Sequence, residues 1–208
     1  MKKLAFVGAG SHADAVRPFI DTSEYTLVGF FDDKPIDTHD GLPILGHTSE
    51  VGKALDDGVI DSVFITVGDN QKRAEWFNDV AEHHYDALIN IVSPTAIVLS
   101  QKSIQGRGIF IGSGAFVGKY VSIHDDVILN TYSVVEHHSQ VHAHVNMTPR
   151  SVIAGFVEIG QGAYMGLNSS VIQVISIAPW TVVGAGAVVV QTINESGTYV
   201  GVPAKKVK

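Results

Sequence analysis

The sequence predicts a two-part chain, an α/β N-terminal domain with a parallel, Rossmann-like sheet followed by a parallel β-helix. Three observations predict it. Strand-like and helix-like segments alternate over residues 1–94, and aliphatic residues recur at every sixth position from 111 to 189 without a break. The charge balance also changes between the two parts, from −9 over residues 1–94 to +2 over residues 95–208. We therefore place the domain boundary near Ser93-Pro94, with domains 1–94 and 95–208.

The N-terminal part is expected to form a parallel, doubly wound sheet, because its predicted strands alternate with helices. Short aliphatic and aromatic runs indicate the strands; glycine or aspartate follows the first three runs, and Ser93-Pro94 follows the fourth. The expected strands are 4–7, 27–31, 62–67 and 87–92, and the expected helices are 14–20, 48–55 and 71–83.

The C-terminal part has a period of six, which fits neither the 3.6-residue turn of an α-helix nor a plain strand alternation. A short strand followed by a tight turn fits it, with one aliphatic side chain per hexad pointing inward and successive coils stacking into one core. A β-sandwich with accidental spacing is the alternative, which fourteen unbroken repeats disfavour. The fourteen residues are Ile111, Val117, Ile123, Leu129, Val135, Val141, Met147, Ile153, Ile159, Met165, Val171, Ile177, Val183 and Val189.

Glycine follows five of these aliphatic residues, and we predict that these glycines adopt the positive φ of a tight turn. They are Gly112, Gly118, Gly160, Gly166 and Gly184. Between Gly118 and Gly160 five of the six residues at the same position are polar and the sixth is Ala154, which suggests a site in the middle of the array. The polar residues at or beside it include His124, Asn130, Glu136, His137, His138 and His142. For the histidines other than His137, a plain exposed surface position is the favoured interpretation.

Composition excludes several classes of protein. The chain has no cysteine, so disulfides, a thiolate nucleophile and a cysteine-ligated zinc are excluded, and no metal is expected. Its net charge of −7 disfavours nucleic-acid binding. The N-terminus is too short in apolar residues for a signal peptide, and no later segment could span a membrane, so we expect a cytoplasmic protein.

The turn after the first expected strand reads Gly8-x-Gly10-x-x-Ala13, and Asp32 follows the next strand. This spacing has three interpretations: an NAD site, a purely structural strand-to-helix turn, or a nucleotide-sugar site, which we favour. In each of them the carboxyl ends of parallel strands share one rim. The residues expected at this rim are Ser11, His12, Asp32, Asp33, Lys34 and Asp69.

Four sequence features, taken in order, resemble the bacterial nucleotide-sugar acetyltransferases grouped with the sialic-acid O-acetyltransferases. They are Gly8-Ala9-Gly10-Ser11-His12, Phe31-Asp32-Asp33, Asn130-Thr131 followed by Glu136-His137, and Gly201-Val202-Pro203-Ala204-Lys205. The resemblance covers almost the whole chain. It implies a left-handed β-helix with three hexads per coil, so that residues 18 apart stack on one another. It also implies acetyl-CoA as the co-substrate and a homotrimer with each site shared by two chains.

The same resemblance implies residue roles in an N-acetyltransferase that acts on a UDP-type amino-sugar. By this resemblance His137 matches the family's catalytic base, a task that imidazole suits because it titrates near neutral pH and can take a proton from the acceptor. Glu136 is a second catalytic candidate. The substrate would contact Gly10, Ser11, His12, Asp32, Asp33, Lys34, Asn130 and Thr131, with His12 at the pyrophosphate and Asp33 and Lys34 at the uracil. The coenzyme would contact Asn146, Gly155, Gly166 and Lys205.

The sequence departs from the family at two positions. An acid often follows the catalytic histidine, but this chain has His138, so the group that orients His137 is open between Glu136 and the more distant Asp126. A second histidine often lies nine residues on, where this chain has Asn146.

Three other functions stay open. One is O-acetylation of a sialic acid, and another is a non-catalytic trimer that binds a nucleotide-sugar. The third is a β-helical zinc enzyme that uses the imidazoles of His124, His137 and His142.

Overall fold

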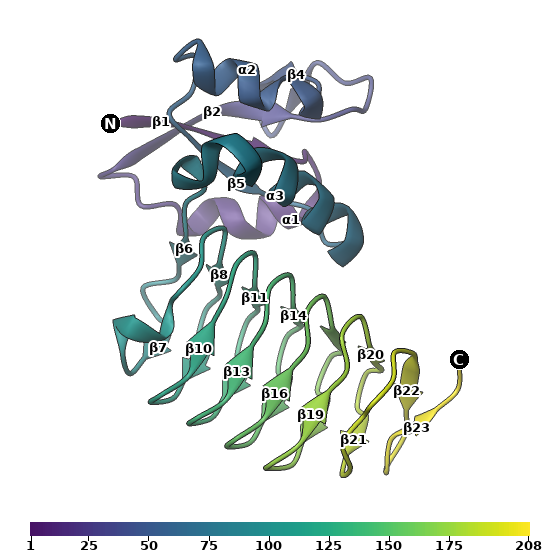
Figure 1. Cartoon of the computed structure of the whole chain (residues 1–208). Helices are drawn as coiled ribbons and strands as arrows, with labels where there is room; N and C mark the ends of the chain where they lie inside the picture. Colours follow the sequence, from purple (N-terminus) through teal and green to yellow (C-terminus); the bar gives the residue numbers. More distant parts are fainter. The chain divides into compact units, whose positions relative to one another are not determined.

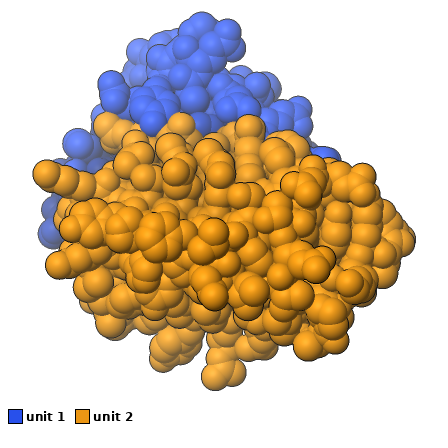
Figure 2. Space-filling model, turned by 60° about the horizontal axis from the view of Figure 1, so that its bottom comes forward, with its two compact units in different colours: residues 1–91 blue, residues 92–208 orange.

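The computed structural model describes the whole chain, residues 1–208, as two compact units, Met1–Ile91 and Val92–Lys208. Figure 2 colours the two units separately. The first is an α/β unit, and the second is a solenoid of two-residue strands (Figure 1). Both parts of the predicted fold class are therefore present. None of the helices has the length and apolar character needed to cross a lipid bilayer.

The α/β unit is built on a five-stranded sheet in the order β3-β4-β2-β1-β5. Neighbouring strands run parallel, except that β3 is antiparallel to β4. The elements are β1 Lys2–Val7, α1 Ser11–Val16, β2 Tyr25–Phe31, β3 Thr38–His39, β4 Leu42–Gly46, α2 Val51–Asp56, β5 Ser62–Ile65 and α3 Asn70–His84, with 3₁₀ turns at Arg17–Phe19, Thr48–Glu50 and Tyr85–Ala87.

Alternation along the strands gives the two faces of this sheet different side chains. Ala5 and Val7 of β1 belong to the cluster that packs against α2 and α3. Phe6 points to the opposite face, where its ring lies 6.1 Å from that of Phe30 and 6.0 Å from that of Phe64. Strands with both faces covered by apolar groups read as continuous hydrophobic runs, which is why the sequence marks β1, β2 and β5 clearly.

One prediction for this unit was wrong, and one feature of it was not predicted. Residues 87–92 do not form a strand of its sheet: Leu88 makes a single bridge to Val63, and β6, Ile91–Val92, is the end strand of a solenoid sheet. The hairpin of β3 and β4 was missed, although its two-residue turn, Asp40-Gly41, has the sequence that favours a type I′ turn. Both turn residues have positive φ, 45° and 76°.

The solenoid has three strand faces, and the hexad prediction is confirmed in full. All fourteen hexad aliphatics are at most 3% exposed. Strands 18 residues apart pair in parallel, as in Ile123 with Val141, an arrangement typical of a left-handed β-helix. The strands are β7 Ile97–Val98, β8 Phe110–Ile111, β9 Phe116–Val117, β10 Ser122–Ile123, β11 Ile128–Leu129, β12 Val134–Val135, β13 Gln140–Val141, β14 Asn146–Met147, β15 Val152–Ile153, β16 Glu158–Ile159, β17 Tyr164–Met165, β18 Ser170–Val171, β19 Ser176–Ile177, β20 Val182–Val183, β21 Val188–Val189, β22 Thr198–Val200 and β23 Lys205–Lys206, with a 3₁₀ turn at Gln101–Ser103.

The predicted position of the positive-φ turn residue was wrong by two places. Positive φ occurs three residues after thirteen of the fourteen inward aliphatics, at corners that carry bulky residues as well as glycine, such as Tyr120 at 62° and Phe156 at 59°. The glycines one place after the aliphatic have a different reason. A Cβ on Gly118 would lie 2.8 Å from the backbone nitrogen of His137 in the next coil, and one on Gly160 would lie 2.6 Å from that of Pro179. Close approach of stacked coils therefore requires these glycines.

Candidate functional site

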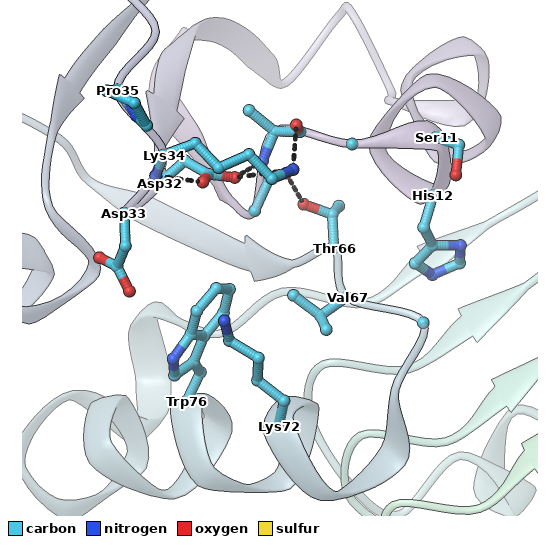
Figure 3. A pocket seen from close by; sticks show the side chains of 14 residues that line it. Ser11, His12, Asp32, Asp33, Lys34, Pro35, Thr66, Val67, Lys72 and Trp76 are labelled. Carbon is cyan, nitrogen blue, oxygen red and sulfur yellow. Dashed lines mark hydrogen bonds and ion pairs between the residues drawn. The ribbon is translucent and has the colours of Figure 1, made fainter.

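The α/β unit has a cavity of about 530 Å³ at the carboxyl ends of β1, β2 and β5 (Figure 3). This is the edge of a parallel sheet at which ligands bind in α/β proteins. The loop after β1, the loop after β2, the loop after β5 and the first turns of α3 line it. The lining residues are Gly8, Ala9, Gly10, Ser11, His12, Asp32, Asp33, Lys34, Pro35, Thr66, Val67, Gly68, Lys72 and Trp76.

The loop after β1 has the glycine that its conformation requires. Gly8 has a φ of 109°, and a Cβ there would lie 3.0 Å from the carbonyl oxygen of Thr66. The Thr66 hydroxyl donates to the carbonyl oxygens of Gly8 and Val7, so the loop is tied to β5. A Cβ on Gly10 would meet only the ammonium of Lys34, at 3.9 Å. Gly10 therefore leaves the cavity open, whereas Gly8 shapes the backbone.

Asp32 has an internal role in this cavity. It is 7% exposed; its Oδ2 accepts the backbone N–H of Ala9 at 2.6 Å and its Oδ1 accepts that of Lys34 at 2.9 Å. The ammonium of Lys34 lies 3.9 Å from Oδ2 and donates to the carbonyl oxygen of Ala9 at 3.4 Å. Because both carboxylate oxygens already accept hydrogen bonds, Asp32 joins the loops after β1 and β2, and Lys34 supplies a cation beside the glycine loop.

The other predicted rim residues differ in charge and position. The Asp33 carboxylate accepts the backbone N–H of Thr48 at 3.0 Å and its hydroxyl at 2.9 Å, and these hydrogen bonds lower its pKa. Burial, followed by the nearby Arg73 guanidinium, lowers the pKa of His12 to about 4. His12 is therefore neutral at physiological pH and carries a single N–H donor, but no charge.

Lys72 and Trp76 of α3, which were not predicted from the sequence, also face the cavity (Figure 3). The Lys72 ammonium lies 4.5 Å from the ring centroid of Trp76, a cation–π distance. Asp69 caps the helix by accepting the backbone N–H of Lys72 at 2.8 Å. The spacing of four residues on a helix that begins at the rim was the signal available in the sequence, since such residues share one helix face.

The solenoid displays His137 at a corner, with its imidazole exposed to solvent. The ring lies against Gly155 of the next coil, because a Cβ on that glycine would be 2.6 Å from the ring atom Cε1 and 2.9 Å from Nε2. Its Nδ1 lies 3.0 Å from Nδ1 of His138, within hydrogen-bond distance. The ring also meets that of Phe156 edge to face at 5.4 Å. An imidazole in this position can exchange a proton with a molecule bound outside the solenoid.

Neither acid proposed to orient His137 contacts its imidazole. The Glu136 carboxylate accepts the backbone N–H of His137 at 3.4 Å, so the acid meets the main chain of its neighbour and not the ring. Asp126 is buried and pairs with His144, whose Nδ1 lies 2.9 Å from its Oδ2. The physical reason is the hexad geometry, in which adjacent positions of a coil point in different directions while residues 18 apart lie against each other.

The remaining histidines do not assemble a metal site. The rings of His124 and His142 stack at 5.3 Å, and the Nε2 of His142 lies 2.9 Å from the Glu158 carboxylate. Burial, then the facing His142, lowers the pKa of His124. No group of three or more histidine, aspartate or glutamate side chains is placed to hold a metal ion. The three imidazoles that the zinc hypothesis requires are therefore not grouped, since His137 contacts different neighbours.

The other predicted contacts are spread over the solenoid. Asn130 and Thr131 lie one hexad before His137, at the preceding corner of the same coil, where the Asn130 Oδ1 accepts the Thr131 N–H at 2.8 Å. Asn146 is buried on β14, and its Oδ1 has no hydrogen-bond partner. The two remaining predicted coenzyme contacts are Gly166 and Lys205. Gly166 lacks a Cβ and so leaves room for the backbone of Ala185, and Lys205 is exposed on β23. Of the predicted coenzyme contacts, only Gly155 lies against His137 within one chain.

Comparison with known proteins places these features in context. Residues 3–80 match the family described as the PglD N-terminal domain. The acetyltransferase domain of PglB from Neisseria gonorrhoeae, solved in complex with acetyl coenzyme A, is 29% identical with a TM-score of 0.88, and the match covers 99% of each chain.

Two further solved structures match over nearly the full length. A perosamine N-acetyltransferase from Caulobacter crescentus, solved with CoA and GDP-perosamine, is 28% identical with a TM-score of 0.89, covering 99% of this chain and 97% of that one. WeeI from Acinetobacter baumannii, at 21% identity, has a TM-score of 0.79 over 98% of this chain and 99% of its own, which is a likeness of fold.

Proposed function

We propose that this chain, a member of the PglD-like nucleotide-sugar acetyltransferases, transfers the acetyl group of acetyl-CoA to the amine of a UDP-linked amino-sugar. The observation that carries this proposal is the exposed imidazole of His137 at a solenoid corner. It occurs in a chain that overlays along its length on acetyltransferases solved with coenzyme A or its acetyl ester.

The chemistry requires one base and no covalent enzyme intermediate. The acceptor amine attacks the carbonyl carbon of the thioester, and the Nε2 lone pair of His137 takes the proton that the nitrogen loses. The new C–N bond forms as the C–S bond breaks, and the imidazolium returns the proton to the departing thiolate. Imidazole suits both proton transfers because its unperturbed pKa lies near neutral pH.

The cavity of the α/β unit has the groups that a nucleoside diphosphate needs. The open loop at Gly10 and Ser11 lies beside the Lys34 ammonium, and we assign these to the diphosphate, which pairs well with a point charge. His12 adds a neutral donor there. We assign the nucleobase to the other side of the cavity, between Asp33 and the indole of Trp76, because every nucleobase has a face that stacks on an aromatic ring.

The assignment of Trp76 can be tested by fluorescence. The chain has two tryptophans, so a Trp180→Phe variant leaves Trp76 as the single indole. We expect UDP to quench its emission with saturation, and Trp76→Leu to weaken UDP binding about tenfold by calorimetry, near the lower end of the range for base stacking. Uridine monophosphate serves as the comparison ligand that lacks the second phosphate. Unchanged emission at saturating UDP would remove Trp76 from the site.

A homotrimer is part of the proposal, because the substrate contacts predicted on the solenoid do not meet in one chain. Asn130 and Thr131 occupy one corner of a coil and His137 the next, so a substrate that contacts all three requires a second copy. The face between these corners offers apolar groups for such packing, since Phe116, Val134 and Val152 point outward along it, and Val152 is 37% exposed. We place the coenzyme between adjacent copies, near Asn146 of one of them.

The direct test of function is a thiol-release assay with acetyl-CoA and a panel of acceptors. The panel comprises UDP-linked and GDP-linked amino-sugars, the free amino-sugars, and a sialic acid. We expect thiol release with a UDP-linked amine, and a product heavier by one acetyl group in mass spectrometry. Preference for the GDP-linked amine would show that the nucleotide carries guanine and not uracil. Transfer to a hydroxyl without a nucleotide would identify a sialic-acid O-acetyltransferase. Nucleotide-sugar binding without turnover on any acceptor would identify a non-catalytic binding protein.

A further inference from the structure

The neighbour of His137 is a second histidine in a constrained position. We propose that His138 is a positioning residue, which accepts a hydrogen bond from Nδ1–H of His137 and thereby leaves the Nε2 lone pair of His137 free to act as a base. The hydrogen bond between the two rings stands on the geometry, whereas the choice of His137 as its donor and the catalytic consequence rest on the proposed function.

The hydrogen bond between the two rings permits only two neutral arrangements. Its ends are both Nδ1 atoms, 3.0 Å apart, so one carries the proton and the other a lone pair. If His137 donates, its Nε2 has the lone pair and can take a proton. If His138 donates, the Nε2 of His137 carries hydrogen and cannot act as a base. When His137 has taken the substrate proton, both of its nitrogens are protonated, and only the first arrangement keeps the hydrogen bond intact.

The imidazole of His138 is held on both of its faces. It stacks on Phe156 with a centroid distance of 4.6 Å and an interplanar angle of 12°, and it meets the tilted ring of Tyr120 at 4.7 Å and 36°. These three residues lie 18 apart, at the same corner of successive coils. The backbone N–H of His138 donates to the carbonyl oxygen of Lys119 at 3.1 Å. A ring clamped in this way keeps its Nδ1 directed at His137 before any substrate arrives, which is what pre-organisation of a catalytic base requires.

No other group competes for this role in the structure. The carboxylate of Glu136 meets the backbone N–H of His137, and that of Asp126 meets His144. The position after the base therefore supplies the acceptor itself. It does so with a neutral aromatic nitrogen, whose place is fixed by stacking on the coils before and after.

Two substitutions separate the hydrogen bond from the stacking. His138→Phe keeps an aromatic ring between Tyr120 and Phe156 but removes the acceptor, and the corner already holds aromatic residues at positive φ. His138→Glu replaces the acceptor by a carboxylate. We expect the Phe variant to lose about 3- to 10-fold in kcat, the value of one hydrogen bond, with the KM for acetyl-CoA unchanged. The Glu variant should recover the lost rate.

The second readout needs no substrate, so it stands even if the acceptor has been misidentified. Nitrogen-15 NMR of the ligand-free protein should show His137 with hydrogen on Nδ1 and not on Nε2, and the His138→Phe variant should shift His137 toward hydrogen on Nε2. A parent protein whose His137 already carries its hydrogen on Nε2 would overturn the proposal. So would a Phe variant with the parental tautomer and kcat, or a loss of rate that the Glu variant leaves unrestored.

Discussion

Replacing His137 by alanine should lower kcat about 10²- to 10⁴-fold, the usual contribution of a general base. The imidazole is exposed and its partners are side chains at the same corner, so its removal should leave the solenoid core intact. Because the base acts only as the proton moves, the KM for acetyl-CoA should change little. Steady-state thiol release measures both quantities, and single-turnover kinetics can show that the chemical step is the one that slows.

A matched control is the substitution His124→Gln. It removes another imidazole of the solenoid, at a position whose ring stacks on His142 and not on the proposed catalytic corner. We expect parental turnover from this variant and an unchanged melting temperature from both. Parental turnover in His137→Ala would mean that another group accepts the proton, and the proposed mechanism would then be wrong.

Adding one methyl group in the coil after His137 should also lower activity, by about 10- to 100-fold. A Cβ on Gly155 would lie 2.6 Å from Cε1 of the His137 ring and 2.9 Å from Nε2, so Gly155→Ala forces the ring to move. The ring is the far end of a side chain and can turn aside without disturbing the coil. A displacement of about 1 Å at a catalytic group can cost about 10²-fold in rate. The measurement is kcat together with the melting temperature, which we expect to stay close to that of the parent.

Gly118→Ala provides the matched comparison from the coil before. Its Cβ would lie 2.8 Å from the backbone nitrogen of His137, and a main-chain atom within a stacked coil cannot turn aside. We therefore expect Gly118→Ala to lower the melting temperature, in contrast to Gly155→Ala. Equal kcat in the parent and Gly155→Ala would show that the ring position seen here is not the one used in catalysis.

The solenoid was readable from the sequence because its period is local. Every hexad has one inward aliphatic side chain. A shift of one residue along a strand would turn these aliphatic side chains outward, so the sequence pattern defines which residues form the core. The corners were not readable in the same way. The positive-φ position tolerates Tyr120, Phe156 and Trp180 as well as glycine, and the rings of Tyr120 and Phe156 pack against His138 of the neighbouring coil. The glycines instead mark where two coils come too close for a side chain.

The α/β unit shows the same division. The strands β1, β2 and β5 could be predicted because strands buried on both faces are continuous apolar runs in the sequence. Gly8 could be predicted because it begins the turn after β1. The roles of individual polar groups did not follow from their spacing. Asp32 stands where a ribose-binding acid is expected, yet its oxygens accept two backbone N–H groups, because the loops after β1 and β2 approach each other there. Trp76 was passed over because its place at the cavity depends on how α3 packs on the sheet.

By itself, the sequence determined that this protein joins an α/β unit to a β-helix; its hexads pointed to a polar stretch in the middle of the array, and a family resemblance singled out His137 within it. Only the tertiary structure decided that the Nδ1 of His137 faces His138, that Glu136 and Asp126 have other partners, and that Gly155 makes room for the imidazole. The physical reason is the separation along the chain between the residues that interact. A hexad is a property of neighbours along the chain, whereas the direction of a ring is set by residues 18 positions away, which meet only when the coils stack.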